Sequence, residues 1–183
     1  MGYLRLVHSA ETVPAPDSNC LDAFDHEIEY IFATLRRLGA APHEVEDLAQ
    51  DVFIVLHRNW PTLDMGRPLR PYLFGVAFRI VRAYHRRWSR EISRPGLDTD
   101  DGAPSPEASL QSEESLALLL AALDALPLSR RAVVVMHELE EIPIAEVARR
   151  LSITRFCAYA RLRKGRKELA AAVRRLSKAG ART

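Results

Sequence analysis

The chain has 183 residues and a net charge of +2, which allows one domain or two small ones. Its hydrophobic fraction of 48% is ordinary for a globular protein, and two cysteines are too few for a disulfide framework or a four-cysteine metal site. No signal peptide is recognisable, and no apolar run reaches the roughly 18 residues of a membrane span. We therefore expect a cytoplasmic protein without membrane insertion.

Helical spacing of apolar residues dominates the first half of the chain. It predicts a helix over residues 24–38, which Gly39 is well placed to end. A second helix is predicted between the prolines at 42 and 61, and a third over about 71–90. Packed together, these helices would form one small all-α domain over residues 21–94.

An acidic segment separates the two halves of the chain. Residues 95–115 contain glycine, proline and six acidic residues but no lysine or arginine, which is typical of a flexible linker. A leucine-rich stripe then predicts a further helix, and Ser129 is well placed to cap the next one. The second domain is predicted over residues 116–177, and loose ends are predicted at 1–20 and 178–183.

The most informative pattern lies near the C-terminus. Pro143 is placed to begin a short helix, Thr154 is placed to cap a second one, and a tight turn around Ser152 separates them. This is the layout of a helix-turn-helix, whose second helix enters the DNA major groove. From Ile142 onward, twelve Lys and Arg stand against two Glu, a net charge of +10. This asymmetry favours a polyanionic partner over a merely solvated helix face.

Four motifs, in this order, resemble the extracytoplasmic-function (group IV) sigma factors of the sigma-70 family. Residues 46–53 read Glu-Asp-Leu-Ala-Gln-Asp-Val-Phe and look like the polymerase-binding helix of that family. Residues 67–79, continuing into Arg86 and Arg87, resemble its promoter-melting segment. Residues 125–139 are similar to the start of its second conserved module, which the helix-turn-helix completes. The resemblance implies an all-α fold of two small helical domains, a sigma region 2-like bundle and a sigma region 4-like helix-turn-helix, joined by the flexible acidic linker.

The resemblance also implies a function. It predicts a bacterial alternative sigma factor that binds core RNA polymerase, directs it to specific promoters and promotes transcription initiation. The expected partners are the β′ clamp helices and β flap of the core enzyme, promoter DNA, and an anti-sigma factor that could hold the cytoplasmic chain at the membrane. No cofactor is implied. The alternative is a stand-alone helix-turn-helix regulator, whose first domain would be expected to bind a ligand, receive a signal or dimerise.

Three sets of site residues follow from the same resemblance. Polymerase binding is expected on the polar face of the second helix, at Glu46, Asp47, Gln50 and Asp51. Minus-ten binding is expected in the loop before the third helix and along the basic face of that helix, at Met65, Arg67, Arg79, Arg82, Arg86 and Arg87. Minus-thirty-five binding is expected on the second helix of the helix-turn-helix, at Arg155, Phe156, Ala158, Tyr159, Arg161, Arg163 and Arg166.

Two positions depart from the family pattern. Ala83 stands four residues after Arg79, where many members have Asp, and this leaves the preferred minus-ten base open. Ser152 occupies a turn position that is often Gly, so a slight shift of the local geometry is expected. A structural reading of the acidic second helix also stays open, since carboxylates in a first turn favour the helix dipole.

No catalytic constellation is recognisable in the sequence. His137 and Glu138 begin a metalloprotease-like pattern, but Glu141 stands where the second histidine is required. The six histidines are scattered without the spacing of metal ligands, and no glycine-rich phosphate loop occurs. We therefore expect neither an enzyme nor a metal-binding protein.

Overall fold

The computed structural model describes residues 19–92 and 110–180, and all regular structure within these ranges is helical. No helix in the two ranges combines the length and apolarity needed to cross a membrane. A 3-10 turn lies on each side of α2, and a π-helical turn follows α5. The helices and turns in chain order are α1 (Cys20–Arg37), η2 (Pro42–Glu44), α2 (Val45–Asn59), η3 (Trp60–Thr62), α3 (Leu69–Ile92), α4 (Leu110–Asp124), α5 (Leu128–Val134), η4 (Val135–Leu139), α6 (Ile144–Arg150) and α7 (Arg155–Gly180).

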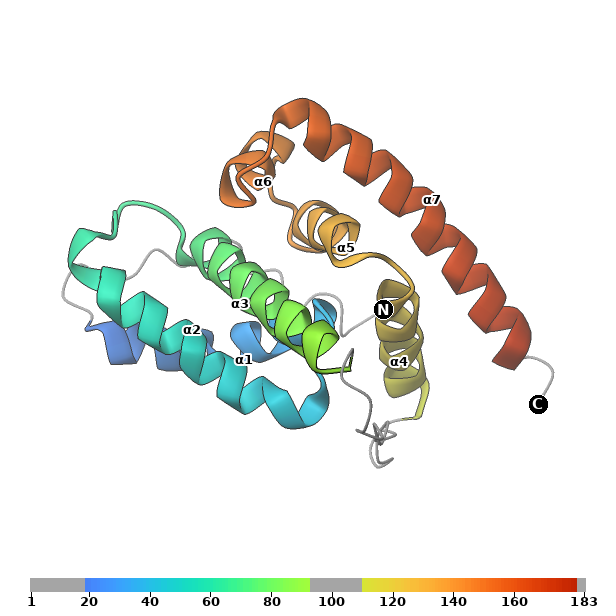
Figure 1. Cartoon of the computed structure of the whole chain (residues 1–183), viewed down its shortest axis with the longest axis horizontal. Coiled ribbons are helices and arrows are strands. Elements are labelled where there is room, and N and C mark those ends of the chain that lie inside the picture. The colour runs from blue at the N-terminus through green and yellow to red at the C-terminus, as the bar shows by residue number, and fades with distance from the viewer. Residues whose placement is uncertain (1–18, 93–109, 181–183) are drawn as a thin grey trace.

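Two groups of helices make up the fold (Figure 1). Helices α1, α2 and α3 pack on one another as a bundle, whereas α4, α5 and α6 pack on the long α7. Helices α5 and α6 lie between α3 and α7, and α6 contacts α3 directly. The prediction of an all-α fold with two small helical domains is therefore confirmed. Residues 1–18 of the predicted leader and 95–109 of the predicted linker lie outside the described residues.

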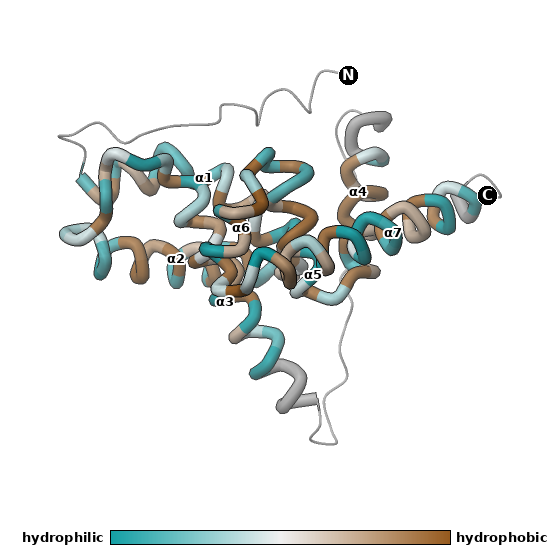
Figure 2. Tube along the Cα trace, turned by 90° about the horizontal axis from the view of Figure 1, so that it is seen from above, coloured by the Kyte–Doolittle hydropathy of each residue, from teal (hydrophilic) through white to brown (hydrophobic). Residues whose placement is uncertain are grey.

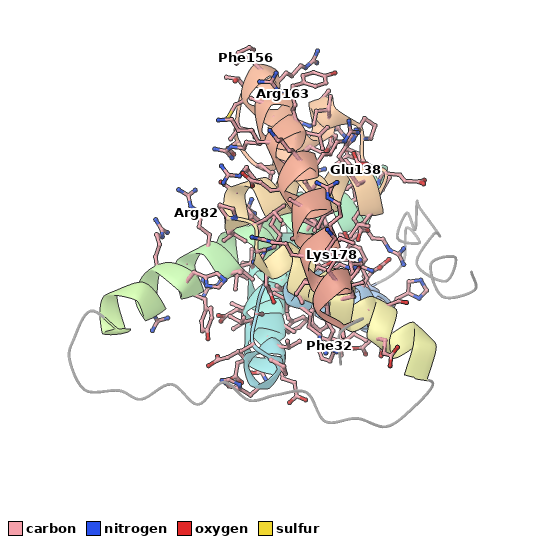
Figure 3. All side chains as sticks on the ribbon, turned by 90° about the vertical axis from the view of Figure 1, so that its right-hand side faces the viewer. Phe32, Arg82, Glu138, Phe156, Arg163 and Lys178 are labelled. Atoms are coloured by element: carbon pink, nitrogen blue, oxygen red, sulfur yellow. The ribbon has the colours of Figure 1, made fainter. Side chains whose placement is uncertain are left out.

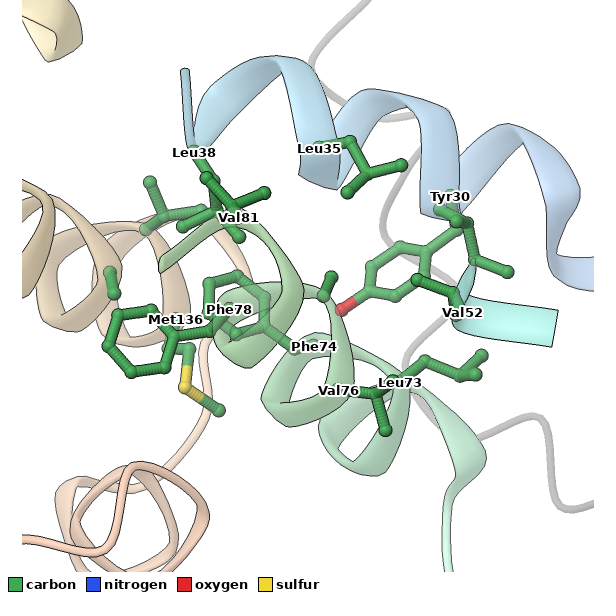
Figure 4. Packing of buried hydrophobic residues seen from close by; sticks show 14 of the residues in the cluster. Tyr30, Leu35, Leu38, Val52, Leu73, Phe74, Val76, Phe78, Val81 and Met136 are labelled. Atoms are coloured by element: carbon green, nitrogen blue, oxygen red, sulfur yellow. The ribbon is translucent and has the colours of Figure 1, made fainter. Parts of the chain in front are cut away.

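The two groups share one apolar core, and α3 is its centre. Phe74 and Val81 of α3 are fully buried, and they belong to the same cluster as Leu35 of the first group. Met136, which follows α5, lies beside the rings of Phe74 and Phe78 (Figure 4). Burying a side chain of this size stabilises a fold by about 1.5–3 kcal/mol. The domains are thus joined by apolar packing as well as by polar contacts.

Polar contacts close the same interface. Arg37 at the end of α1 forms a salt bridge with Glu140, with 2.7 Å between Nη1 and Oε1, and both side chains are mostly buried. Arg131 of α5 pairs with Asp124 of α4 at 2.7 Å, and its guanidinium lies against the backbone of Gly39. Buried ions of this kind destabilise a protein strongly when one partner is lost. The relative position of the domains therefore depends on these residues.

Gly39 ends α1 as the sequence predicts. Its φ of 93° lies in the left-handed region, where a side chain is unfavourable. Its N–H donates to the carbonyl of Arg36, and the N–H of Ala40 donates to the carbonyl of Leu35, both at 3.0 Å. This is the Schellman pattern of helix termination.

Four helix starts differ from the predictions. Helix α1 begins at Cys20, which is four residues before the predicted start and is the last residue of the predicted leader. Helix α4 begins at Leu110, inside the segment predicted as linker up to residue 115, so the helix extends beyond its leucine stripe. Ser129, predicted to cap α5, lies within the first turn, because Pro127 precedes the helix and its carbonyl accepts the first helical hydrogen bonds. Helix α3 begins two residues before Pro71, since a proline in the first turn sacrifices no helical hydrogen bond. The domain limits themselves stay predictions.

We expect Gly39→Ala to lower the free energy of unfolding by more than about 2 kcal/mol. A side chain in the left-handed conformation costs about 1–2 kcal/mol, and this methyl group would also overlap the guanidinium of Arg131. Urea unfolding followed by circular dichroism measures the loss. Gly66→Ala, in the loop before α3, is the control and should change the free energy by less than about 0.5 kcal/mol. Equal losses in the two variants would contradict the role given to Gly39.

Candidate polymerase and nucleic-acid interfaces

Helix α2 buries one face and exposes a polar one. Its core positions, including Val52 and Leu56, pack into the first domain. The four residues predicted to bind polymerase are all exposed: Glu46, Asp47, Gln50 and Asp51. The last three are spaced by three and four residues, so they share one side of the helix. The structure therefore brings the predicted acidic surface together.

Ile54 extends this acidic surface and is missing from the predicted set. Its side chain is 44% exposed, although it is a large apolar residue in the middle of a helix. It follows Asp51 by three residues and Gln50 by four, which places it beside both. A signal was present in the sequence, because position 54 lies two residues after the core residue Val52 and so points away from the core.

Helix α3 presents a basic strip. The four arginines predicted here are all exposed: Arg79, Arg82, Arg86 and Arg87. Three of them recur at steps of three and four residues, which aligns them along one face. In the second half of α3, the coloured part of the tube projects from the packed helices and is mostly hydrophilic (Figure 2), and Arg82 points outward from the ribbon (Figure 3).

The loop between α2 and α3 forms a pocket with the start of α3. Its volume is about 270 Å³, and it is lined by Leu63, Asp64, Met65, Arg67, Pro68, Leu69, Tyr72 and Arg150. Met65 and Arg67, both predicted to contact the minus-ten element, therefore line one pocket. Asp64 orders the loop, because it pairs with Arg67 at 2.8 Å and accepts a hydrogen bond from the N–H of Gly66 at 3.1 Å. Burial raises the pKa of the Tyr72 hydroxyl, which stays protonated at the pocket wall.

The predicted helix-turn-helix is present as α6 and α7. Thr154 caps α7 as expected, since its Oγ1 accepts a hydrogen bond from the N–H of Cys157 at 3.1 Å. Ser152 in the turn has a φ of 53°, and its N–H donates to the carbonyl of Arg149 at 3.2 Å. Serine thus adopts the left-handed conformation that glycine favours, at a cost of about 1–2 kcal/mol. Whether the turn geometry differs from that of a glycine turn stays a prediction.

The start of α7 exposes large side chains. Phe156 is 85% exposed and lies at the outer tip of the helix (Figure 3), and Tyr159 is 58% exposed one turn later. Arg155 and Arg163 are exposed as predicted, whereas Arg161 is half-buried. Phe156 and Tyr159 stand three residues apart, so their rings share one side of the helix.

Two predicted contacts on α7 look different in the structure. Ala158 is completely buried, so its prediction as a DNA contact is wrong. It stands four residues before the buried Leu162 and therefore lies on the core face of α7. Arg166 is exposed, but it is bound to Glu138, with 2.9 Å from Nε and 2.5 Å from Nη2 to Oε1. A phosphate would have to compete with this carboxylate.

Several titratable groups serve the fold. His137, from the metalloprotease-like pattern, has its Nδ1 2.9 Å from the carbonyl oxygen of Ile142. Burial lowers the pKa of His85 on α3, and the positive charge of Arg131 lowers it further, so the neutral ring is favoured beside the domain interface. Among residues 19–92 and 110–180, no cluster of His, Cys, Asp and Glu could hold a metal ion.

Comparison with known proteins matches both domains to one family. Residues 23–91 match sigma-70 region 2, and residues 116–169 match sigma-70 region 4. The ferric citrate uptake sigma factor FecI of Escherichia coli (strain K12) is 30% identical over 122 residues, which is 65% of this chain and 69% of FecI. The chain belongs to the sigma-70 family, in its extracytoplasmic-function group. It is an alternative sigma factor that directs RNA polymerase to promoters.

Other relatives agree over most of the chain. The sigma factor SigF of Caulobacter vibrioides is 28% identical over 145 residues, 77% of each chain. Among solved structures, the sigma factor RpoE of Bartonella quintana, in complex with the anti-sigma factor NepR, aligns with a TM-score of 0.64 at 19% identity, over 84% of this chain and 98% of RpoE. CnrH, in complex with the cytosolic domain of CnrY, aligns with a TM-score of 0.60 at 19% identity, over 83% and 85%. At this identity the two structures show the fold.

We expect Glu138→Gln to raise the affinity of this sigma factor for promoter DNA about twofold to fivefold. The substitution releases Arg166 from an exposed ion pair. The interaction free energy of such a pair is about 0–1 kcal/mol, which DNA binding no longer has to overcome. Fluorescence anisotropy with a labelled promoter duplex measures the change. The gain should vanish when Arg166→Ala is added. A gain that persists without Arg166 would show that this arginine does not bind DNA.

Proposed function

We propose that this sigma factor uses three separate surfaces, one for polymerase and two for promoter DNA. The observation that carries the proposal is the separation of exposed charge. Carboxylates gather on α2, whereas arginines gather on α3 and α7. Acidic surfaces favour basic protein partners, and arginines position and read nucleic acid. The chain itself supplies binding and needs neither a cofactor nor catalytic chemistry of its own.

The surface for polymerase is the acidic face of α2. It docks on the basic β′ clamp helices through Asp47, Gln50 and Asp51, with Glu46 at its edge. Opposite charges speed the encounter and fix the register more than they raise affinity. Ile54 supplies the apolar contact that a stable interface needs near its centre. The second domain contacts the β flap.

The surface for the minus-ten element combines α3 with the pocket before it. The strip of Arg79, Arg82 and Arg86 follows the phosphates of the non-template strand, and Arg87 adds to it. A base that leaves the stack is bound in the pocket, where Tyr72 offers an aromatic ring. Stacking and hydrogen bonds in such a pocket offset the cost of unstacking.

The surface for the minus-thirty-five element is the exposed start of α7. Arg155 and Arg163 can read guanine or bind phosphate, and Arg161 binds phosphate from its half-buried position. Phe156 and Tyr159 contact apolar edges such as the thymine methyl group in the major groove. Arginine pairs with guanine discriminate between bases by about 1–3 kcal/mol each.

An anti-sigma factor is the remaining partner that we propose. The similar structures of RpoE and CnrH were both determined with a partner, NepR and CnrY. A protein of this kind would keep the chain inactive in the bacterial cytoplasm, or at the membrane when the anti-sigma factor is itself anchored there.

In vitro transcription tests the function as a whole. Purified bacterial core RNA polymerase is mixed with a pool of bacterial promoter fragments, with and without this protein. New start sites that depend on the protein are expected, and their alignment gives the promoter sequence. Fragment binding without polymerase, together with no new transcripts, would favour the stand-alone regulator instead.

We expect the double substitution Asp47→Lys and Asp51→Lys to weaken binding to core polymerase at least about tenfold, because it puts like charges against a basic partner. The structure should survive, since both residues are exposed. Co-purification with core polymerase and a binding titration measure the effect. Asp25→Lys with Glu29→Lys makes the same change, at the same spacing, on exposed positions of α1. If the two double variants bind core polymerase with the same affinity, α2 is not the docking surface.

We expect Arg161→Ala with Arg163→Ala to weaken binding to the promoter fragments found above. Fewer counterions would be released, so the slope of log affinity against log salt should fall by about 2. Titrations at several salt concentrations measure both quantities. Arg174→Ala with Arg175→Ala removes the same charge from exposed positions near the far end of α7 and should change the slope little. An unchanged slope in the first variant would remove Arg161 and Arg163 from the DNA surface.

A further inference from the structure

The pocket before α3 has one wall that comes from the other domain. Seven of its lining residues belong to the loop and the start of α3, but the eighth, Arg150, is the last residue of α6. The guanidinium of Arg150 lies over the ring of Tyr72, 6.0 Å from the ring centroid. A cation held over an aromatic face uses the same surface that a nucleobase uses for stacking. The helix-turn-helix therefore supplies one wall of this pocket and covers the ring of Tyr72.

The position of Arg150 is built into the fold. Its Nε donates to Glu146 at 2.6 Å, which directs the side chain, and burial lowers its pKa, as does the neighbouring charge of Arg67. The backbone is fixed as well, since the Arg150 carbonyl oxygen lies 3.4 Å from the place where a Cβ on Gly75 would stand. A methyl group added at Gly75 would stand in van der Waals contact with the backbone of α6. The small residue on α3 thus lets the two helices approach closely.

With the two domains packed on each other, which we call the closed arrangement, the chain cannot contact both promoter elements at once. Helix α7 begins five residues after Arg150, and five residues span at most about 18 Å, so its start lies within about 20 Å of α3. Elements centred near positions −10 and −35 are about 25 base pairs apart, which is roughly 85 Å along B-form DNA. The domains must therefore separate before each reaches its element.

From these contacts we propose that Arg150 is an internal plug, which covers the Tyr72 ring in the base-binding pocket of the free chain and leaves it when the domains part. The proposal rests on the sigma-factor function and on the minus-ten role of the pocket. Arg37 with Glu140, and the apolar contact of Met136 with α3, hold the plug in place. The free protein is then a poor binder of single-stranded promoter DNA, because the competent state is rarely populated. Polymerase would bind the two domains at separate places and hold them apart. Arg150 would then leave the pocket.

The test uses the full-length protein without polymerase. The probe is a fluorescein-labelled single strand that carries the minus-ten element and is taken from a promoter found in the transcription assay. Arg150→Ala should bind this strand at least about tenfold more tightly than the unchanged protein, since removing the plug frees the competent state. A gain in affinity would be decisive, because the loss of a positive charge by itself would weaken binding to DNA.

Arg149→Ala is the matched control. Arg149 also pairs with Glu146, but it is more exposed and does not line the pocket. This variant should bind the strand no more tightly than the unchanged protein. If Arg150→Ala is folded by circular dichroism and binds no more tightly than Arg149→Ala, the plug is overturned.

A second variant guards against misfolding of the first. Glu140→Lys puts a like charge against Arg37, so it weakens the domain interface without changing a residue of the pocket. It should show the same gain if Arg150→Ala does not fold, and no gain would then overturn the proposal. Transcription with core polymerase distinguishes a failure of the plug proposal from a failure of the proposed sigma-factor function. Normal transcription without a gain in strand binding defeats the plug alone, whereas absent transcription defeats the proposed function.

Discussion

The packing of the second domain on α3 is the constraint on which the rest of the structure depends. Phe74 and Val81 lie in the core of the first domain, and Met136 completes the same core from the second. The salt bridge between Arg37 and Glu140 closes the edge of this contact. Because apolar burial is roughly proportional to area, separating the domains costs free energy that a partner must supply. In the proposed mechanism, promoter binding and domain opening are therefore coupled.

The outer surface is organised by charge around this shared core. The acidic face of α2, the basic strip of α3 and the start of α7 are all exposed while the domains are closed. In the proposed function, a first encounter of these surfaces with polymerase or duplex DNA requires no rearrangement. The pocket before α3 differs, because Arg150 belongs to its wall. In the proposed mechanism, the free sigma factor can meet its partners, whereas capture of a single-stranded base waits until the domains move apart.

Much of the fold was predictable because its signals are local. Helical spacing, the glycine at position 39 and the cap at Thr154 each act within a turn or two of their own position, and the structure confirms them. The errors have physical causes as well. Ala158 was expected to face DNA, but a small apolar residue four positions before Leu162 packs inward. Ile54 was overlooked because the predicted docking set contained only polar residues, although an exposed apolar side chain lies on the same side of the helix.

The sequence by itself determined the helices, the order of the two domains, the family and the charge of each surface. These follow from residue type and spacing along one helix. Tertiary structure alone decided that Glu138 binds Arg166 and that Arg37 meets Glu140, residues 28 and 103 positions apart. It alone placed Arg150 over Tyr72, on a different helix. Such pairs depend on how separate helices pack, and no periodicity records that, because each partner looks like an ordinary exposed charge in its own segment.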